Sequence, residues 1–359
     1  MDLSIAPSII INPSYGNNPY LRAIEVALAV KEVLQEEFLI VVPHVYGERQ
    51  KKIIFEQFGD DASITLDASY GELMKQMFFD GNSYQECLEH WLHHHDAVGR
   101  TAHEYLEANY KIAMEIGRAP LVPLHIHPSY YMSFSRTSTI LRKAINNTAI
   151  QINGHLLQEA ATKRKILEDQ YDLRFITVPG TFEPEDDDIP TPLTVRLPLC
   201  PAEDIEKGIY VTLSGMPEVD SMEDIAKSFG SRLYTNDATK IPGTIQAPPS
   251  IIAHPNIIAH VARAGWGAAW MSLLTDTPLI VPHYTPNDDP EIFFNIQRLE
   301  ELGIGTAFHG QTLEEILKLQ PGITAYRKSL KERFGNLDGA SLTAVKIAEN
   351  FLYKRGKHR

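Results

Sequence analysis

Short apolar runs alternate with segments of helical periodicity along the first part of the chain. Ile9–Ile11 has the character of a buried strand, and a segment rich in turn-forming residues, 12–19, follows it. Apolar residues at helical spacing predict a helix over 20–34, and the apolar run 38–43 predicts a second strand. A strand, a glycine-containing loop, a helix and a second strand are typical of the opening of a Rossmann-like domain.

The same alternation continues to about residue 178. We expect helices over 48–58, 70–78, 84–117 and 138–171, and strands over 63–66, 120–128 and 174–178. The histidine-rich helix carries His90 and His94 one turn apart, a spacing that would let them share a metal ion. The sequence places no third ligand beside this pair, so we favour a polar helix face and expect no metal site.

A change of composition separates this region from the rest of the chain. Residues 179–208 contain several prolines and the acidic run Glu185–Asp188, which predicts an extended linker. A strand beginning at Gly208 opens a second run of strands and helices. We therefore assign an N-terminal domain to 1–180, a linker to 181–207, a C-terminal domain to 208–340 and a terminal helix to 341–359.

Composition and charge exclude several classes of protein. The chain has 359 residues, of which 43% are hydrophobic and 22% charged, so two globular domains of ordinary size are expected. A formal net charge of −13 disfavours nucleic-acid binding. Two cysteines far apart, Cys87 and Cys200, do not form a disulfide framework. With neither a membrane-spanning run nor a signal sequence, the expected location is the cytoplasm.

The stretch 246–305 carries the clearest chemical signal. An apolar strand over 257–262 ends in Arg263, and Gly265 and Gly267 mark the turn into a helix. Glycines let backbone N–H groups approach a ligand, and the N-terminus of the helix adds partial positive charge. An anion site and a plain turn between a strand and a helix, with Arg263 in solvent, are equally compatible with these residues alone.

The same stretch resembles the donor-binding motif of GT-B glycosyltransferases that use UDP-sugars on small acceptors. The matching landmarks keep their spacing over sixty residues: Ala247-Pro248, His254-Pro255, Gly265-Trp266, Ser272, Thr277-Pro278, Pro282, Glu291, Asn295 and Gly303-Ile304-Gly305. The resemblance implies an α/β protein of the GT-B fold, with two Rossmann-like parallel-sheet domains that face a central cleft. It also implies a last helix that packs back across this cleft.

The resemblance implies donor-side roles for particular residues. Arg263 stands where the family has a histidine that contacts the diphosphate, and a guanidinium can also make that contact. The diphosphate would also contact Ser214, Gly215 and the turn residues Gly265, Trp266, Gly267 and Ala268. Glu291 would bind sugar hydroxyls, and Asn295 would support the loop. Met271, Gln246 and Ile292 replace the residues that hold ribose, uracil and sugar in the family.

On the acceptor side, the family carries a catalytic histidine directly after a glycine in the first loop. Here Tyr15, Gly16 and Asn17 form that loop, and an amide cannot act as a base near neutral pH. His127 is the substitute that we consider, because it lies near the expected carboxyl end of the strand 120–128. A hydrogen-bonded structural histidine remains the alternative.

These observations favour a glycosyltransferase that uses a nucleotide-diphosphate sugar, such as a UDP-sugar, to glycosylate a small-molecule or lipid acceptor. Inversion at the sugar and independence of metal ions and cofactors are expected from the resemblance. The losses at Asn17, Met271 and Gln246 keep a second class open: a non-catalytic relative that binds a nucleotide, a sugar or a partner protein. A nucleotide-sugar epimerase is disfavoured, because its acidic and histidine catalytic residues are not recognisable.

Overall fold

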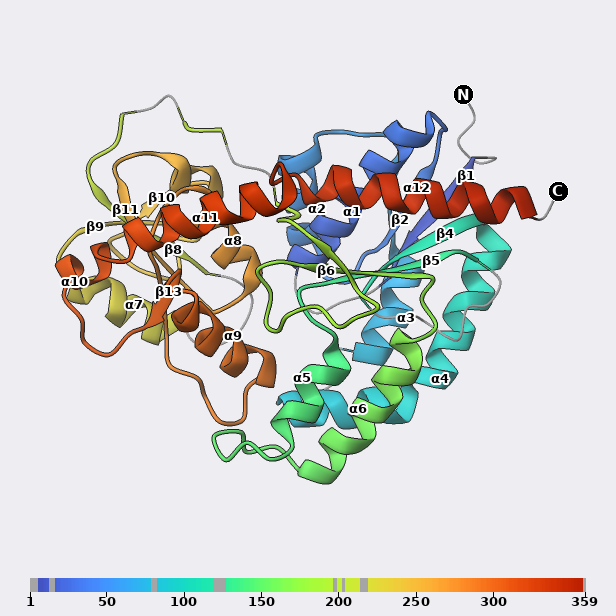
Figure 1. Cartoon of the computed structure of the whole chain (residues 1–359), viewed down its shortest axis with the longest axis horizontal. Helices are drawn as coiled ribbons and strands as arrows, with labels where there is room; N and C mark the ends of the chain where they lie inside the picture. The colour runs from blue at the N-terminus through green and yellow to red at the C-terminus, as the bar shows by residue number, and fades with distance from the viewer. Residues whose placement is uncertain are drawn as a thin grey trace. The chain divides into compact units, whose positions relative to one another are not determined.

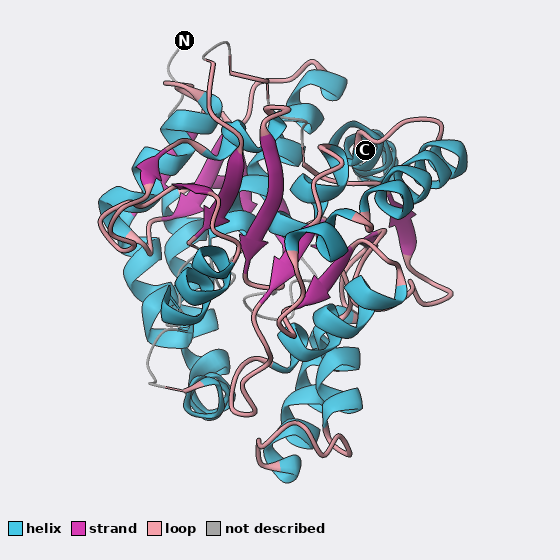
Figure 2. Ribbon diagram, turned by 90° about the vertical axis from the view of Figure 1, so that its left-hand side faces the viewer, coloured by secondary structure: helices cyan, strands magenta, loops and turns pink. Residues whose placement is uncertain are grey.

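The structure is a computed structural model that describes residues 6–12, 17–78, 83–118, 127–195, 199–201, 204–213 and 219–357. The chain divides into two compact units. The first domain consists of Met1–Val178, Glu183–Thr194 and Asp338–Arg359, and the second of Pro179–Phe182 and Val195–Leu337. In both, strands are flanked by helices, as Figures 1 and 2 show.

The first domain is built on a parallel sheet in the order β3-β2-β1-β4-β5-β6-β7. Its strands are β1 (Pro7–Ile11), β2 (Leu39–Pro43), β3 (Ile64–Asp67), β4 (Lys111–Gly117), β5 (Ser129–Ser133), β6 (Leu173–Thr177) and β7 (Ile189–Thr191). The central strand β1 is apolar because both faces of such a sheet are covered, and Ile9, Ile10 and Ile11 have no exposed surface.

Helices of the first domain connect these strands and cover the sheet. They are α1 (Asn17–Leu34), α2 (Gly47–Phe58), α3 (Ala68–Phe78), α4 (Tyr84–Asn109), α5 (Thr137–Ala144), α6 (Gly154–Glu168) and α12 (Gly339–Lys357). The last of them returns to this domain from the far end of the sequence: α12, red in Figure 1, packs along α1, drawn in blue. Tyr130 of β5 also donates a hydrogen bond to Asn350 of α12, at 3.2 Å.

The second domain repeats the arrangement with a parallel sheet in the order β10-β9-β8-β11-β12-β13. Its strands are β8 (Gly208–Thr212), β9 (Arg232–Thr235), β10 (Ile245–Gln246), β11 (Ile257–Ala262), β12 (Leu279–Val281) and β13 (Gly305–Ala307). Its helices are α7 (Val219–Ser228), η2 (Pro249–Ala253), α8 (Trp266–Leu274), α9 (Pro290–Glu301), α10 (Leu313–Leu317) and α11 (Gln320–Phe334). The two sheets confirm the predicted pair of Rossmann-like parallel-sheet domains.

Several elements differ from the sequence predictions. The single helix expected over 138–171 is two helices, α5 and α6. The helix expected over 84–117 ends at Asn109, and the apolar residues that follow it form β4. The expected linker 181–207 is not extended throughout, because Glu183–Thr194 belongs to the first domain and includes β7. Pro190 is compatible with a strand here because β7 is the edge of the sheet, where a missing N–H breaks no ladder.

Within the described residues, no helix combines the length and the apolar character that crossing a membrane requires.

Candidate functional site

The direction in which the chain winds reverses between β8 and β11 in the second domain. The strand order places these two strands side by side, and the last residues of the two strands, Thr212 and Ala262, pair with each other. Ligands of open parallel sheets bind outside the carboxyl ends of the strands at such a reversal. The turn after β11 therefore lies where the sequence analysis placed the anion site. Ser214 and Gly215, which follow β8, lie outside the described residues.

Gly265 begins the helix that follows this turn. It is the N-cap of α8, with φ −96° and ψ 142°, and it has no side chain to cap the first N–H groups of the helix. A Cβ added to Gly265 would meet no atom of the described residues within 4 Å, so there is room beside this cap. Gly267 and Ala268, in the first turn, are half-buried. This geometry presents backbone donors and partial positive charge to an anion.

The side chain of Asn295, in α9, stabilises this turn through hydrogen bonds. Its side-chain oxygen accepts hydrogen bonds from Trp266 Nε1 at 2.8 Å and from Thr181 Oγ1 at 2.7 Å. Its amide nitrogen donates to the carbonyl oxygen of Ala264 at 2.8 Å. Trp266 is 2% exposed, so its indole ring is part of the domain interior. Of the ligand contacts expected for Trp266, only one through its backbone N–H is compatible with this burial.

Arg263 forms an ion pair with an acidic residue that the sequence analysis did not consider. Its Nη2 lies 2.5 and 2.6 Å from the two carboxylate oxygens of Asp288, and both side chains are partly exposed. The expected positive charge is thus present at the turn but is balanced by Asp288. A ligand phosphate would have to compete with this carboxylate for the guanidinium.

The first turn of α9 adds two further carboxyl groups. Asp289 is the N-cap of α9 and accepts a hydrogen bond from the backbone N–H of Glu291 at 2.9 Å. Burial, followed by the charge of Glu291, raises the pKa of Asp289 to about 7. The sequence Asp289-Pro290 is a recognisable start of a helix and could have identified this cap. Glu291, expected to bind sugar hydroxyls, is only 9% exposed.

A buried histidine connects the two strands at the reversal to α8. His260 of β11 contacts Thr212 Oγ1 at 2.7 Å through Nε2 and Ser272 Oγ at 2.7 Å through Nδ1. Burial lowers the pKa of His260 to about 3, so the ring is neutral near pH 7. A neutral imidazole donates through one nitrogen and accepts through the other, which suits two hydroxyl partners. His260 therefore holds α8 against the sheet.

Two residues that replace family landmarks have structural partners in the second domain. Met271 packs against the apolar cluster formed by Tyr210, Tyr234, Ala247, Ile251, Ile252 and Ile257. Gln246 accepts a hydrogen bond from the backbone N–H of Ala238 and donates one to the carbonyl oxygen of Asn236, both at 2.8 Å. These contacts stabilise the domain and leave neither side chain with the chemistry of the residue that it replaces.

The corresponding reversal in the first domain lies between β1 and β4. Asn12, directly after β1, donates a hydrogen bond to Glu115 of β4 at 3.2 Å, and both side chains are almost fully buried. Burial raises the pKa of Glu115 to about 8, so this carboxyl is mostly protonated at neutral pH. The following loop residues Tyr15 and Gly16 lie outside the described residues. Asn17 begins α1, but its side chain is outside them as well.

The strand expected over 120–128 falls almost entirely outside the described residues, and His127 lies next to the amino end of β5. Residues 119–126 are outside the described part of the chain, and His127 comes two residues before β5 begins at Ser129. Because all strands of the sheet are parallel, this position is toward its amino edge. The geometric reason for choosing His127 as the catalytic base is therefore lost.

His127 instead belongs to a polar cluster with α4. Its Nε2 lies 3.4 Å from Glu107 Oε1, and Nδ1 of His103 lies 3.7 Å from Glu107 Oε2. Burial lowers the pKa of His127 below its usual range, although Glu107 acts in the opposite direction. The ring is therefore neutral at physiological pH, which suits hydrogen bonding or metal binding.

Comparison with solved structures finds chains of the same architecture. UGT2 from Phytolacca americana, complexed with UDP-2fluoro-glucose and pterostilbene, matches with a TM-score of 0.59 and 13% identity over 96% of this chain and 100% of its own. A UDP-glucose: anthocyanidin 3-O-glucosyltransferase in complex with UDP matches with a TM-score of 0.62 and 11% identity over 97% and 100%. A UDP-glucosyltransferase from Polygonum tinctorium matches with a TM-score of 0.60 and 13% identity over 97% and 99%.

No family model and no curated protein matches the sequence. At 11–13% identity the structural likeness shows the fold, which is that of the GT-B glycosyltransferases. It confirms the fold class that the sequence predicted.

Proposed function

We propose that this chain is a glycosyltransferase that takes its sugar from a nucleotide-diphosphate sugar. The observation that carries the proposal is the open helix N-terminus of α8, placed with Arg263 at the strand reversal of a GT-B domain. This arrangement suits a diphosphate, which is a compact dianion. Two of the similar solved structures contain UDP-2fluoro-glucose or UDP, which is the same ligand class.

In this proposal the second domain stabilises the leaving group. Negative charge builds on the diphosphate as the bond to the sugar breaks. The N–H groups of Trp266 and Gly267 and the guanidinium of Arg263 would then bind the transition state, with its developing charge, more tightly than the ground state. These donors supply the stabilisation without a metal ion. The N–H of Ala268, also expected to contact the diphosphate, already donates to the carbonyl oxygen of Gly265 at 3.0 Å. Transfer with inversion follows if the acceptor attacks from the face opposite the diphosphate.

Glu291 would hold the sugar in this reaction, and Asn295 would act indirectly. A carboxylate accepts hydrogen bonds from sugar hydroxyls, and Glu291 lies in the first turn of α9, close enough to Asp289 to raise its pKa. Asn295 supports the turn through Trp266 and Ala264 and would not contact the substrate. Substitutions of Glu291 should therefore change the choice of sugar, whereas those of Asn295 should weaken every donor alike.

The nucleotide preference should be weak. Met271 cannot accept hydrogen bonds from ribose as a carboxylate does, and Gln246 is occupied by its own loop. We expect UDP to bind less than about a hundredfold more tightly than ADP or GDP, which corresponds to roughly 2.7 kcal/mol. Titration calorimetry with the three nucleotides tests this, and a larger preference for UDP would show that other residues contact the base.

One observation favours a second function. Arg263 is neutralised by Asp288 at 2.5 Å, which reduces the attraction that the turn exerts on a dianion. This weaker attraction would be compatible with a non-catalytic relative that binds a nucleotide or a sugar weakly. The two functions differ in turnover rather than in the location of the site.

The deciding experiment combines turnover with binding. The protein is incubated with radiolabelled UDP-, ADP- and GDP-sugars and a panel of phenolic and lipid acceptors, and nucleotide binding is measured in parallel. Transfer or donor hydrolysis supports the enzyme, and binding without turnover supports the second function. No binding of any nucleoside diphosphate overturns both.

Arg263→Ala tests the residues that bind the diphosphate. Its loss should weaken nucleoside diphosphate binding by about 1.5–3 kcal/mol, the range for charged hydrogen bonds. Arg232→Ala is the matched control, because Arg232 also forms a close ion pair, with Glu206 at 2.7 Å, but stands at the start of β9 on the opposite edge of the sheet. Equal effects of the two substitutions would contradict the proposed site.

A further inference from the structure

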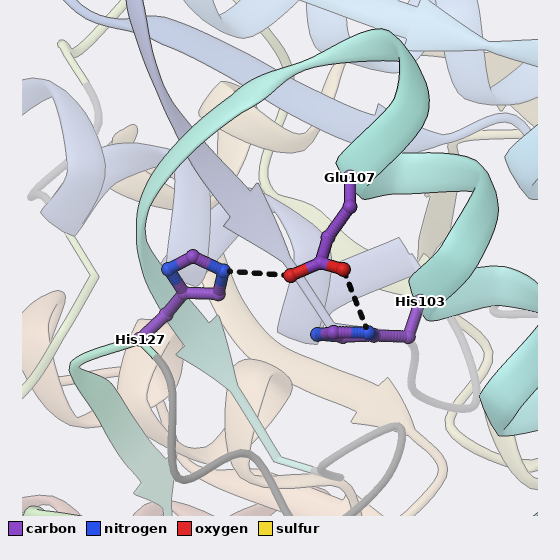
Figure 3. A group of neighbouring side chains, drawn as sticks. All are labelled: His103, Glu107 and His127. Carbon is purple, nitrogen blue, oxygen red and sulfur yellow. Dashed lines mark hydrogen bonds and ion pairs between the residues drawn. The ribbon is translucent and has the colours of Figure 1, made fainter.

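Three side chains at the amino edge of the first domain's sheet converge on one another. His103 and Glu107 lie one turn apart near the end of α4, and His127 lies just before β5. Each offers one ligand atom, and these atoms all lie within 4.8 Å of one another. Figure 3 shows the carboxylate of Glu107 between the two imidazole rings, whose centroids are 6.2 Å apart.

The distances suit a divalent cation. Zinc bonds of about 2.0–2.2 Å to nitrogen and oxygen place neighbouring ligands of a tetrahedral site about 3.4 Å apart. His127 Nε2 and Glu107 Oε1 are already 3.4 Å apart, and one ligand atom from each of the three residues lies within 4.8 Å of the other two. Two imidazoles and one carboxylate are a ligand set that zinc uses with one position left for water.

A buried nitrogen without a partner distinguishes this cluster from an ordinary polar contact. His103 Nε2 is inaccessible to solvent and has no hydrogen-bond partner within the described part of the chain. Buried polar atoms are nearly always paired, so an orphaned imidazole nitrogen indicates a missing ligand. Nδ1 of the same ring faces Glu107 at 3.7 Å, so in the tautomer with its proton on Nδ1 the lone pair is on Nε2.

The surroundings favour a cation and allow it to enter. The cluster lies in the last two turns of α4, where the helix carries partial negative charge. The Glu107 side chain is 43% exposed, whereas those of His103 and His127 are 12% and 18% exposed. Solvent therefore reaches the cluster from the side of the carboxylate, where a water ligand has room.

We propose that His103, Glu107 and His127 form a binding site for a divalent transition-metal cation of the zinc type. The ion would join the end of α4 to the start of β5 and so stabilise the first domain. Glu107 and His127, which it would link, are 20 residues apart in the sequence. Its place at the amino edge of the sheet separates it from the carboxyl edge, where substrates of such domains bind. The proposal is independent of the glycosyl-transfer function.

The test uses the full chain, stripped of metal with a chelator and dialysed. ZnCl2 titration by calorimetry should show one tight equivalent per chain, and Zn²⁺ should raise the thermal midpoint, because it binds only the folded site. CoCl2 should give the intense visible absorption of a tetrahedral site. Glu107→Gln, His103→Gln and His127→Gln should each weaken zinc binding at least about tenfold.

The histidine pair on the same helix provides the matched control. His90 and His94 are also one turn apart on α4, with ring centroids 4.2 Å apart, but are not part of any three-ligand group of described residues. The double variant His90→Gln/His94→Gln should keep the tight equivalent. The proposal is overturned if wild type binds no tight equivalent, or if that equivalent survives Glu107→Gln and is lost in the double variant. Glu107 is exposed enough for its variant to fold, which circular dichroism without metal verifies.

Discussion

The two domains share one strand order but differ in what stands at the point where that order reverses. In the first domain the reversal between β1 and β4 is occupied by Asn12 and a mostly protonated Glu115, both buried. In the second, the reversal between β8 and β11 opens onto the N-terminus of α8 with Arg263 and Asp288 at its side. The same topology therefore places a buried, neutral pair at the reversal of one domain and a charged, partly exposed pair at that of the other.

This difference has a simple physical origin. Burying a carboxyl group without a cation beside it costs least free energy when the group is protonated, and the side chain that Glu115 meets here is the neutral amide of Asn12. Asp288, near α8, remains partly exposed and pairs with the guanidinium of Arg263, which keeps charge at the surface. A ligand anion can replace an accessible carboxylate such as Asp288 as the partner of a guanidinium. A neutral buried pair offers a ligand no such exchange.

The largest expected effect concerns the support of the open turn. Asn295→Ala would leave the indole N–H of Trp266, the carbonyl of Ala264 and Thr181 without their buried partner, at about 3–5 kcal/mol in the free energy of unfolding. Urea unfolding followed by tryptophan fluorescence in a Trp91→Phe background reports on the second domain, which holds the other two tryptophans.

Asn256→Ala serves as the control for that experiment. Asn256 donates one side-chain hydrogen bond, to the carbonyl oxygen of Ile205 at 2.6 Å, at the opposite edge of the same sheet. Its loss should cost about 1 kcal/mol. If both substitutions destabilise the domain equally, Asn295 is not the hub of the turn.

The next effect concerns Glu115, at the strand reversal of the first domain. The pKa of Glu115 is raised to about 8, so the folded state holds a proton that the unfolded state releases near pH 4.5. The stability of the wild type should therefore fall as pH rises from about 5 to 8. Glu115→Gln removes this loss and should be more stable than wild type by about 2–3 kcal/mol at pH 8.5, with little difference at pH 5. Parallel stability curves for the two proteins between pH 5 and 8.5 would contradict the neutral state of Glu115.

A smaller effect of the same sign is expected at the open turn. The pKa of Asp289 is raised to about 7, so its contribution to stability also falls as pH rises between about 4 and 7. Asparagine retains the N-cap of α9 without the charge. Asp289→Asn should gain about 1 kcal/mol on wild type between pH 5 and pH 8, a value reduced for partial exposure. Thermal melts at the two pH values measure the gain, and an equal difference at both would show that Asp289 is ionised throughout.

The smallest expected effect tests whether the surface charge is exchangeable. Asp288→Asn removes the carboxylate that competes with phosphate for Arg263, so nucleoside diphosphate binding should become stronger by about 0.5–1 kcal/mol. This is the opposite of the change expected for Arg263→Ala. Calorimetry with UDP measures both, and weaker binding in Asp288→Asn would mean that the ion pair orients Arg263 rather than competing with the ligand.

Local pattern was sufficient for much of the fold. Apolar runs such as Ile9–Ile11 identified central strands, and the glycines at 265 and 267 identified the start of α8. β4 was missed because no glycine or proline separates it from the 26-residue helix α4, so the apolar pattern reads on without a break. β7 was missed because Pro190 argues against a strand except at a sheet edge, and sequence does not show which strand is the edge.

The site was less predictable because its chemistry depends on pairs distant in sequence. Arg263 and Asp288 are 25 residues apart, and no periodicity joins them. The same holds for His127 and Glu107, whose contact depends on where β5 begins. A residue type at a turn predicts which chemistry is present, but the neutralising partner is set by tertiary packing.

The return of α12 to the first domain has a consequence for how the chain folds as it is made. Residues 195–337 of the second domain are contiguous, whereas the first domain needs Asp338–Arg359 to cover α1. During synthesis the first domain therefore cannot complete its fold until the entire second domain has been translated. Until then, the face of α1 that α12 covers stays exposed. Domains usually complete in N-to-C order on the ribosome, and here the order of completion is reversed.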